Sequence, residues 1–179
     1  ISGYGEGGPR SNDKAYDLAI QAEAGIFAVT GGSEMSKAGV SIADISTATF
    51  VTSSVLAALV RRGLNGTGQT IAVSMLEALT DWVAPALYGA AYTGSEPPRS
   101  GRRHHSIAPY GTFTLSDEST VLIAIQNERE WQQLASDVLA SVELATSPDF
   151  ASNAERFRNV DRLEALVSAA LLRNPADEM

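Results

Sequence analysis

The chain has 179 residues, a formal net charge of -8, 44% hydrophobic and 19% charged residues, and no cysteine. This size and composition predict a globular chain with a real core, forming one domain or pieces of two. The negative charge argues against non-specific binding to nucleic acid or acidic membranes. Without cysteine there are no disulfides, thiolate metal sites or cysteine nucleophiles. We find no signal peptide and no apolar run near the roughly 20 residues of a membrane span.

Turn-forming residues and a short helix are predicted at the N-terminal end. Residues 2–10 are rich in Gly and Pro, which indicates turns. Residues 11–13 can cap a helix over about 14–24, which Gly25 ends. The chain starts at Ile1, and its first residues read as the exit from a strand without a partner. We therefore expect an internal piece of a longer protein.

One acidic residue stands where the longest predicted helix begins. Asp44 follows small residues and enters an Ala-rich helix from about Ile42 to Arg62, which Gly63 should end. A carboxylate there lies beside unpaired N–H groups and the positive end of the helix dipole, so it stays ionised. It can cap the helix, which is the usual role, or act as a nucleophile. Residues at helical spacing predict one buried face, formed by Ile45, Ala48, Thr52, Val55, Leu56 and Leu59.

A glycine-rich turn and a second long helix follow. The turn at 63–68 leads into a predicted strand, Thr70–Ser74. A phosphate loop would run from a strand into a helix, so we interpret 63–68 as a plain turn. Ser74 and Glu77 form a capping box for a helix over about Met75–Tyr92, which Pro85 should kink.

The pattern changes after residues 96–109, which contain Pro and Gly and predict a linker. The expected domains are therefore 1–95 and 110–179. The second should begin with a β-hairpin, formed by residues 110–115 and 120–126. Asn127 should cap a helix to about Leu139. A last helix is expected from about Val160 to Leu172, with Leu163, Leu166, Val167 and Ala170 facing inward.

The two histidines, His104 and His105, are adjacent and lie beside three arginines. Neighbouring side chains in extended chain point apart, so we expect no shared metal ion. Arg99, Arg102 and Arg103 are conspicuous in so acidic a chain. They can bind an anionic ligand such as a phosphate or carboxylate, or form a solvated basic linker.

The order of the segments resembles the family III CoA-transferases, the group that includes formyl-CoA transferase, carnitine CoA-transferase and 2-methylacyl-CoA racemase. The similarity covers nearly all of the chain. The matching blocks are ISGYG (1–5), YDLAIQAEAG (16–25), IAD (42–44), AALVRR (57–62), TGQ (67–69), VSMLEAL (73–79), PYGTF (109–113) and NAER (153–156). The resemblance implies an α/β fold, with part of a large Rossmann-like domain followed by the start of a small α+β domain, incomplete at both ends.

The same resemblance implies an acyl-CoA:carboxylic acid CoA-transferase in which Asp44 is the nucleophile. The reaction would pass through an aspartyl-acyl anhydride and an aspartyl-CoA thioester. The implied partners are an acyl-CoA, a small carboxylic acid and a second copy in an intertwined homodimer in the cytoplasm, with no nucleic acid and no membrane. The resemblance implies coenzyme A as part of the substrate, and we expect no cofactor and no metal. The implied substrate-binding residues are Tyr16, Gln21, Arg102, Arg103 and His104.

Two departures from the family narrow the expected chemistry. Racemases of this group have His before the acid at the position of Tyr16, and a phenol with a pKa near 10 is a poor base, which favours transfer. Formyl-CoA transferases resemble one another in a glycine run before the hairpin, where this chain has residues 101–106, GRRHHS. We therefore expect a dicarboxylate or carnitine-like acceptor held by an arginine, and not formyl or oxalate specificity. The alternatives are a 2-methylacyl-CoA racemase or epimerase, and a non-catalytic paralogue that serves as a binding subunit.

Overall fold

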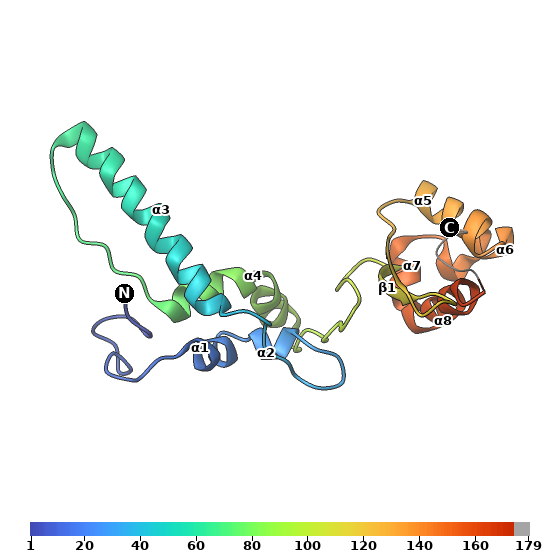
Figure 1. Ribbon diagram of the computed structural model, residues 1–179, viewed down its shortest axis with the longest axis horizontal. Helices are drawn as coiled ribbons and strands as arrows, with labels where there is room; N and C mark the ends of the chain where they lie inside the picture. Colours follow the sequence, from blue (N-terminus) through green and yellow to red (C-terminus); the bar gives the residue numbers. More distant parts are fainter. Residues whose placement is uncertain (174–179) are drawn as a thin grey trace. The chain divides into compact units, whose positions relative to one another are not determined.

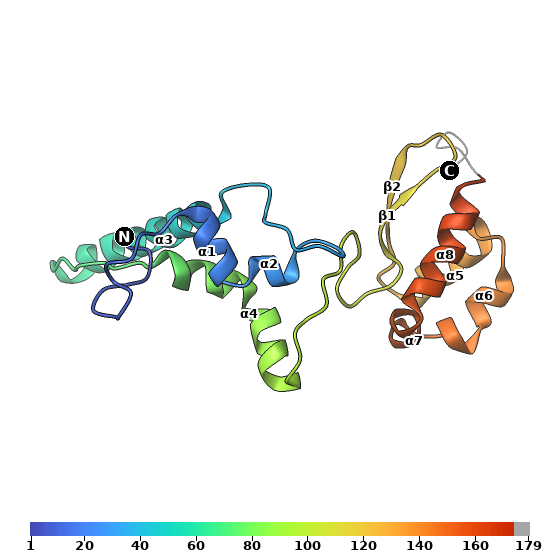
Figure 2. The ribbon, with the colours of Figure 1, turned by 90° about the horizontal axis from the view of Figure 1, so that it is seen from below.

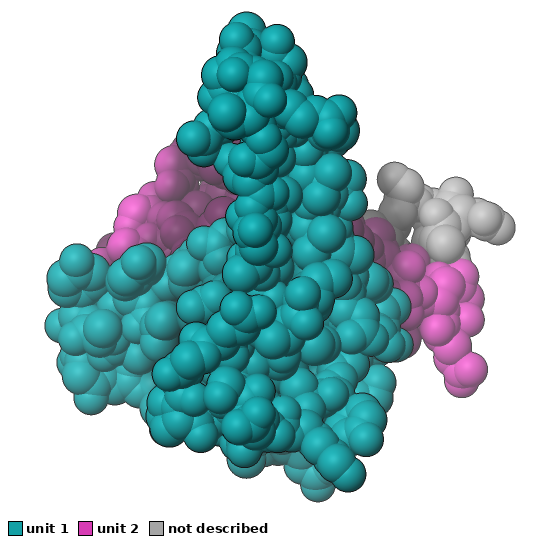
Figure 3. All heavy atoms as spheres, turned by 90° about the vertical axis from the view of Figure 1, so that its left-hand side faces the viewer, with its two compact units in different colours: residues 1–101 teal, residues 102–179 magenta. Residues whose placement is uncertain are grey.

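The computed structural model describes residues 1–173. Two compact units divide the chain, unit 1 over residues 1–101 and unit 2 from residue 102 onward (Figure 3). The division falls inside the predicted linker, 96–109. Unit 1 is helical, whereas unit 2 combines a hairpin with helices, so the mixed α/β class is confirmed.

Unit 1 consists of four helices, of which the first two are separated by a two-residue turn and the others by longer loops (Figure 1). They are α1 (Asp17–Glu23), α2 (Ile26–Val29), α3 (Ile42–Asn65) and α4 (Met75–Thr93). A small apolar core lies where α1, the start of α3 and the first half of α4 meet. Its buried members are Ile20, Ile26, Ala43, Leu79 and Val83. This core fixes the start of α3 and therefore the backbone at Asp44.

Beyond its first turns, α3 has no buried residue and is mostly exposed, contrary to the buried face predicted from its periodicity. Among the predicted inward residues, Ile45, Leu56 and Leu59 are 46–58% exposed. Figure 1 shows the C-terminal half of α3 extending beyond α1 and α4. The buried residues of α3 lie in its first turns, namely Ala43, Ser46 and Thr47. Periodicity identifies an apolar face, but it does not say what covers that face.

By length and composition, α3 also satisfies the criterion for a helix that crosses a membrane, the single case among the described residues. The prediction that no segment reaches this length was therefore wrong by that criterion. Serine and threonine interrupt the apolar run, but the mean hydropathy of α3 still satisfies the criterion. One such helix is weak evidence for a membrane protein.

Two predictions in unit 1 change in the structure, the end of α3 and the strand after it. The helix α3 continues past Gly63 and ends at Gly66, whose φ of 73° is left-handed and whose N–H donates to the Arg62 carbonyl at 2.8 Å. The strand predicted at Thr70–Ser74 is wrong for the described chain, where this stretch makes a single parallel bridge, between Ser2 and Ser74. A strand needs a paired neighbour along its length, and one bridge does not supply it.

The predicted opening of α4 is confirmed. The Ser74 hydroxyl accepts a hydrogen bond from the Glu77 N–H at 3.4 Å. Pro85 lies inside α4, and Figure 2 shows α4 changing direction along its length. The bend agrees with the lost hydrogen bond and the steric clash that a proline causes inside a helix.

Unit 2 begins with the predicted hairpin, β1 (Tyr110–Thr114) and β2 (Thr120–Ala124), which pair antiparallel with Thr112 opposite Leu122. Five helical segments and one 3-10 turn follow. They are α5 (Glu128–Gln133), a π-helical stretch (Leu134–Val138), α6 (Val142–Thr146), the 3-10 turn (Pro148–Phe150), α7 (Asn153–Arg158) and α8 (Val160–Leu171).

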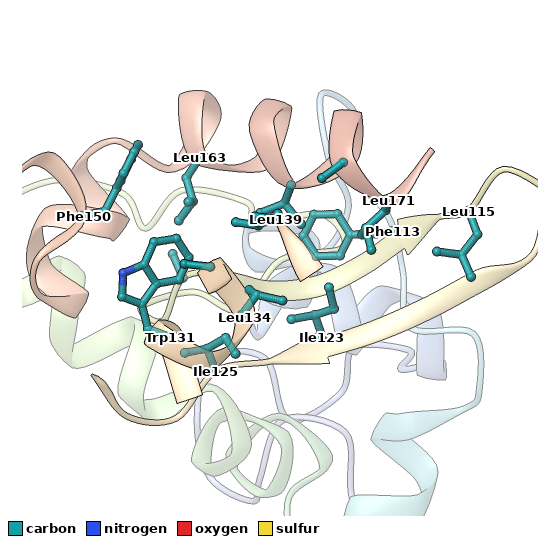
Figure 4. Packing of buried hydrophobic residues seen from close by; sticks show 14 residues of the cluster. Phe113, Leu115, Ile123, Ile125, Trp131, Leu134, Leu139, Phe150, Leu163 and Leu171 are labelled. Atoms are coloured by element: carbon teal, nitrogen blue, oxygen red, sulfur yellow. The ribbon is translucent and has the colours of Figure 1, made fainter. Parts of the chain in front are cut away.

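The core of unit 2 is larger than that of unit 1, and it packs hairpin side chains against α5 and α8 (Figure 4). Phe113 and Ile123 from the hairpin, Trp131 from α5 and Leu163 from α8 are buried. Leu163, Val167 and Ala170 of α8 face inward as predicted, but Leu166 is 36% exposed, so its predicted burial was wrong. The continuous core gives the residues next to the hairpin a rigid base.

Candidate functional site

Asp44 lies in the first turn of α3, on the surface of unit 1. Within residues 1–173 its carboxylate accepts no hydrogen bond and forms no ion pair. It lines neither of the two cavities described for unit 1, of which one lies between α2 and α4 and the other between α3 and α4. Asp44 is therefore a free, water-accessible carboxylate on a backbone that the unit 1 core holds in place.

The cap of α3 comes from a different helix. Ser41, the N-cap residue, makes no side-chain cap hydrogen bond. Instead Asp17, the first residue of α1, accepts from the Ala43 N–H at 2.8 Å and from the Asp44 N–H at 3.4 Å, both through Oδ1. A carboxylate at a helix N-terminus satisfies unpaired donors and interacts favourably with the dipole. The capping role considered for Asp44 is thus performed by Asp17.

The first amides of α3 are all engaged. The Ile42 N–H donates to the Val40 carbonyl at 2.8 Å, and the Ile45 N–H donates to the Ser41 carbonyl at 3.0 Å. Together with the two amides bonded to Asp17, this leaves no N–H group in the first turn of α3 to stabilise an oxyanion. Donors for that purpose would have to come from elsewhere.

Gln21 is buried, only 1% exposed, and both ends of its amide are engaged. Its Nε2 donates to Asp17 Oδ2 at 2.6 Å and to the Val40 carbonyl at 3.2 Å, and its Oε1 accepts from the Ala38 N–H at 2.9 Å. These bonds tie α1 to the loop that leads into α3. The predicted contact of Gln21 with substrate stays a prediction, and the observed hydrogen bonds give it a positioning role.

Tyr16 precedes α1 and is 69% exposed. Its side chain makes no cap hydrogen bond, and its backbone carbonyl accepts from the Ile20 N–H at 3.0 Å. The phenol is therefore free to meet a ligand, and its predicted substrate contact stays a prediction.

The three arginines of the predicted linker have different surroundings. Arg99 donates to the backbone carbonyls of Gly32 and Ser33 at 3.0 and 3.2 Å. In unit 2, Arg103 pairs with Asp161 at 2.7 Å and with Glu164 at 2.8 Å, and these partners raise its pKa against the opposing effect of burial. Arg102 is exposed and pairs with no carboxylate among the described residues. Of the three, Arg102 has the guanidinium that is free to bind an anion.

Arg102 also lines a cavity of about 170 Å³ in unit 2, between the hairpin and α8. Three hydroxyl residues, Thr112, Thr114 and Ser168, share the lining with Glu164, whose charge is offset by Arg103. A guanidinium next to hydroxyl groups is a suitable set of donors for a carboxylate.

The two histidine rings do not point apart as predicted. They stack with centroids 4.4 Å apart, and His104 also stacks on Tyr110 at 4.8 Å. The chain bends at His105 and Ser106, so the alternation of an extended strand does not apply. Burial, and then the charge of His105, lower the pKa of His104. No group of three metal-binding side chains is found in the described part of the chain.

Two side chains of α7 bond to the backbone of the histidine-bearing segment, residues 104–108. Asn153 accepts from the Ala108 N–H at 3.1 Å and donates to the Ser106 carbonyl at 2.9 Å. Arg156, 1% exposed, donates to the Ala108 carbonyl at 2.9 Å. Two polar side chains of one short helix thus fix the backbone that carries His104 and His105.

The whole chain, residues 1–179, matches the sequence profile of CoA-transferase family III. The chain belongs to CoA-transferase family III. Among its relatives are the acetyl-CoA:oxalate CoA-transferase of Acetobacter aceti, 35% identical, and the succinate–glutarate CoA-transferase of Agrobacterium fabrum, 28% identical. The alignments cover 98% and 97% of this chain, but 45% and 43% of those proteins. The chain therefore spans about half the length of these family III relatives.

One solved structure supports the assignment, and a second shows the same fold. A CaiB/BaiF family protein from Brucella suis is 32% identical, with a TM-score of 0.80 over 99% of this chain and 47% of that protein. A protein from Mycobacterium tuberculosis has a TM-score of 0.82 at 23% identity, over 99% of this chain and 47% of that protein, and shows the fold alone.

The sequence did not identify three residues that shape the site of this family III chain. Spacing gives no partner for Asp17, because the amides that it caps are 26 and 27 residues away. Asn153 and Arg156 act on a segment more than 40 residues away. The one available signal was their place in the blocks that resemble the family, which gives no partner for any of them.

Proposed function

We propose that the protein of which this chain forms part transfers CoA from an acyl-CoA to a carboxylic acid, with Asp44 as the covalent nucleophile. Membership of CoA-transferase family III and the names of the relatives support the class of reaction. The observation that carries the role of Asp44 is that Asp17 performs the capping, which leaves the Asp44 carboxylate exposed and unpaired within residues 1–173.

The proposed reaction has four covalent steps and no net redox change. An Asp44 oxygen attacks the thioester carbonyl carbon and expels CoA thiolate, which gives an aspartyl-acyl anhydride. The thiolate attacks the Asp44 carbonyl carbon and releases the donor carboxylate, which gives an aspartyl-CoA thioester. The acceptor carboxylate displaces the thiolate from this carbon. The thiolate then attacks the acceptor carbonyl of the new anhydride, forms the acceptor-CoA and restores the Asp44 carboxylate.

We propose a dicarboxylate as the acceptor. Relatives are named for oxalate, glutarate and D-citramalate, the last in the Chloroflexus aurantiacus protein at 28% identity. The Acetobacter aceti relative is named for oxalate, so the proposed class of acceptors includes oxalate. This widens the expectation from the sequence, which excluded oxalate because the chain lacks the glycine run of the formyl-CoA transferases. Arg102, which has no carboxylate partner in the described part of the chain, and the hydroxyl groups of its cavity would hold one carboxylate of the acceptor.

The assembly and location belong to the same proposal. We infer an intertwined cytoplasmic homodimer that uses CoA thioesters as substrates and holds no resident cofactor, because the family resemblance implies each of these. Light scattering of the full-length protein tests the dimer directly.

The decisive experiment replaces Asp44 in the full-length protein. Asp44→Ala should lower CoA transfer by at least about 10⁴-fold, because it removes the nucleophile. Asp13→Ala is the matched control, since Asp13 is an exposed acid of unit 1 that pairs with Arg10. Hydroxylamine added during turnover should leave a hydroxamate on Asp44, detectable by peptide mass spectrometry.

The outcomes separate the alternatives. Thioester exchange that is undiminished in a folded Asp44→Ala protein would refute the proposal. Deuterium exchange at C2 of a 2-methylacyl-CoA without an acceptor acid would indicate a racemase. A wild-type protein that forms no hydroxamate and turns over no CoA ester would indicate a non-catalytic subunit.

A further inference from the structure

We propose that Asp17 is a positioning residue for the reaction: it holds the backbone of Asp44 so that the Asp44 carboxylate meets the thioester in the right orientation. This inference rests on the proposed function, in which Asp44 is the nucleophile. It adds a requirement that an ordinary helix cap does not carry, namely that the rate of the covalent step depends on a side chain from α1.

The first argument is the site of the contact. Asp17 Oδ1 accepts from the N–H groups of Ala43 and of Asp44 itself, at 2.8 and 3.4 Å. The hydrogen-bonded atoms thus include the backbone of the residue whose side chain would react. A shift of Asp17 would move the Asp44 Cα and redirect its carboxylate.

The second argument is that Asp17 is itself held. Its Oδ2 accepts from Gln21 Nε2 at 2.6 Å, and Gln21 is anchored by Ala38 and Val40 in the loop before α3. Gln21 is 1% exposed, so the anchor of Asp17 is buried, although Asp17 itself is half-buried. Both oxygens of the Asp17 carboxylate are therefore held in place, Oδ2 by Gln21 and Oδ1 by the first amides of α3.

The third argument concerns the chemistry of the side chain at position 17. Both carboxylate oxygens act as acceptors, Oδ1 for two amides and Oδ2 for Gln21 Nε2. Asparagine would keep one acceptor oxygen but turn an NH₂ donor toward the Gln21 donor. Turning Gln21 over would relieve that conflict but would break its bonds to Ala38 and Val40. The structure thus requires a carboxylate and not merely a polar side chain.

The expected consequence is a loss of rate without a matching loss of substrate affinity. A displacement of about 1 Å at a reacting group can lower a rate about 100-fold. A change at position 17 costs Gln21 one hydrogen bond but leaves its bonds to Ala38 and Val40 in place. A purely structural role would instead lower the amount of folded protein and leave the rate per folded molecule unchanged.

The test uses the full-length protein with Asp17→Ala, Asp17→Asn and the control Asp13→Asn. Single-turnover trapping with hydroxylamine measures the rate of hydroxamate formation on Asp44, and steady-state kinetics separate kcat from KM for acetyl-CoA with oxalate and succinyl-CoA with glutarate as probes. We expect Asp17→Ala to lower the trapping rate and kcat about 100-fold with KM within about threefold. Asp17→Asn should lower both about tenfold, and Asp13→Asn should match the wild type.

Each result is assigned to one proposal. Trapping at the wild-type rate in a folded Asp17→Ala or Asp17→Asn protein would overturn the positioning role and leave the proposed function intact. Absence of any hydroxamate on Asp44 in the wild type would overturn the proposed function itself. If Asp17→Ala does not fold, Asp17→Asn carries the test, because it keeps the size of the side chain and one acceptor oxygen. Circular dichroism of each variant establishes folding.

Discussion

The ion pair of Arg156 and Glu128 in unit 2 allows a quantitative test of what holds the histidine-bearing segment. The pair is asymmetric, since the Arg156 side chain is 1% exposed and that of Glu128 is 52% exposed. Arg156 donates to Glu128 at 2.5 and 3.2 Å, to the Ala108 carbonyl at 2.9 Å and to the Phe150 carbonyl at 3.1 Å. We predict that the two carbonyl contacts, and not the charge pair, carry most of its contribution to stability.

The magnitudes follow from the burial of each partner. Arg156→Met would leave two buried carbonyls without their donors, at about 1–3 kcal/mol each, or at least about 2 kcal/mol together. Glu128→Gln leaves both carbonyl bonds in place and keeps one oxygen for the guanidinium. Because water reaches the Glu128 side chain, the lost charge interaction should cost about 1 kcal/mol or less.

The assay is urea unfolding of this chain, followed by the fluorescence of Trp131. Trp131 is 1% exposed, lies 5.3 Å below the Arg156 guanidinium and makes an edge contact with Phe150, so it reports directly on this region. The chain has one other tryptophan, Trp82, which Trp82→Phe removes from the signal. With a slope of about 2 kcal/mol per molar urea, Arg156→Met should lower the midpoint by at least about 1 M. A loss for Glu128→Gln equal to that for Arg156→Met would refute the reasoning, since the charge pair would then dominate.

Two further predictions concern unit 2. Burial and the charge of His105 lower the pKa of His104 below its ordinary 6.5, so the folded state binds fewer protons there than the unfolded state. The free energy of unfolding should therefore be constant above pH 6.5 in this respect and should fall as the pH drops from 6.5 toward the lowered pKa. His104→Gln should flatten this part of the curve of unfolding free energy against pH. In the full-length protein, Arg102→Gln should raise the KM for a dicarboxylate acceptor about tenfold or more, with little change in stability. Arg103→Gln should instead reduce stability, because it removes the bonds to Asp161 and Glu164. Equal KM values for the Arg102→Gln protein and the wild type would contradict the role of Arg102 in binding the acceptor.

Local signals in the sequence predicted local structure well. The caps at Ser74 and Asn127 were correct, because each side chain bonds to an amide three residues later. The hairpin was also correct, since alternating residues flank a short polar turn. In these cases the partners are neighbours in the chain, so spacing alone identifies them.

Features that depend on contacts between distant segments could not be predicted. The cap of α3 by Asp17 requires the packing of α1 against α3, and no spacing rule gives it. Likewise, Arg99, Arg102 and Arg103 form one basic cluster in the sequence, but the fold alone determines that Arg99 and Arg103 are bonded and that Arg102 has no carboxylate partner within residues 1–173. The predicted burial of one face of α3 was wrong for the same reason, because periodicity does not say which element covers an apolar face.

The way in which the backbone before the hairpin is anchored has a consequence for how recognition can change in this protein. Arg103 bridges to Gly111, the His104 N–H donates to the Tyr110 carbonyl at 2.7 Å, and Ala108 is bonded to α7. None of these bonds uses the side chains of Arg102 or His105. Substitutions at these two positions therefore leave the hydrogen bonds that anchor this backbone in place, so a library of variants can present new side chains to ligands on the same backbone.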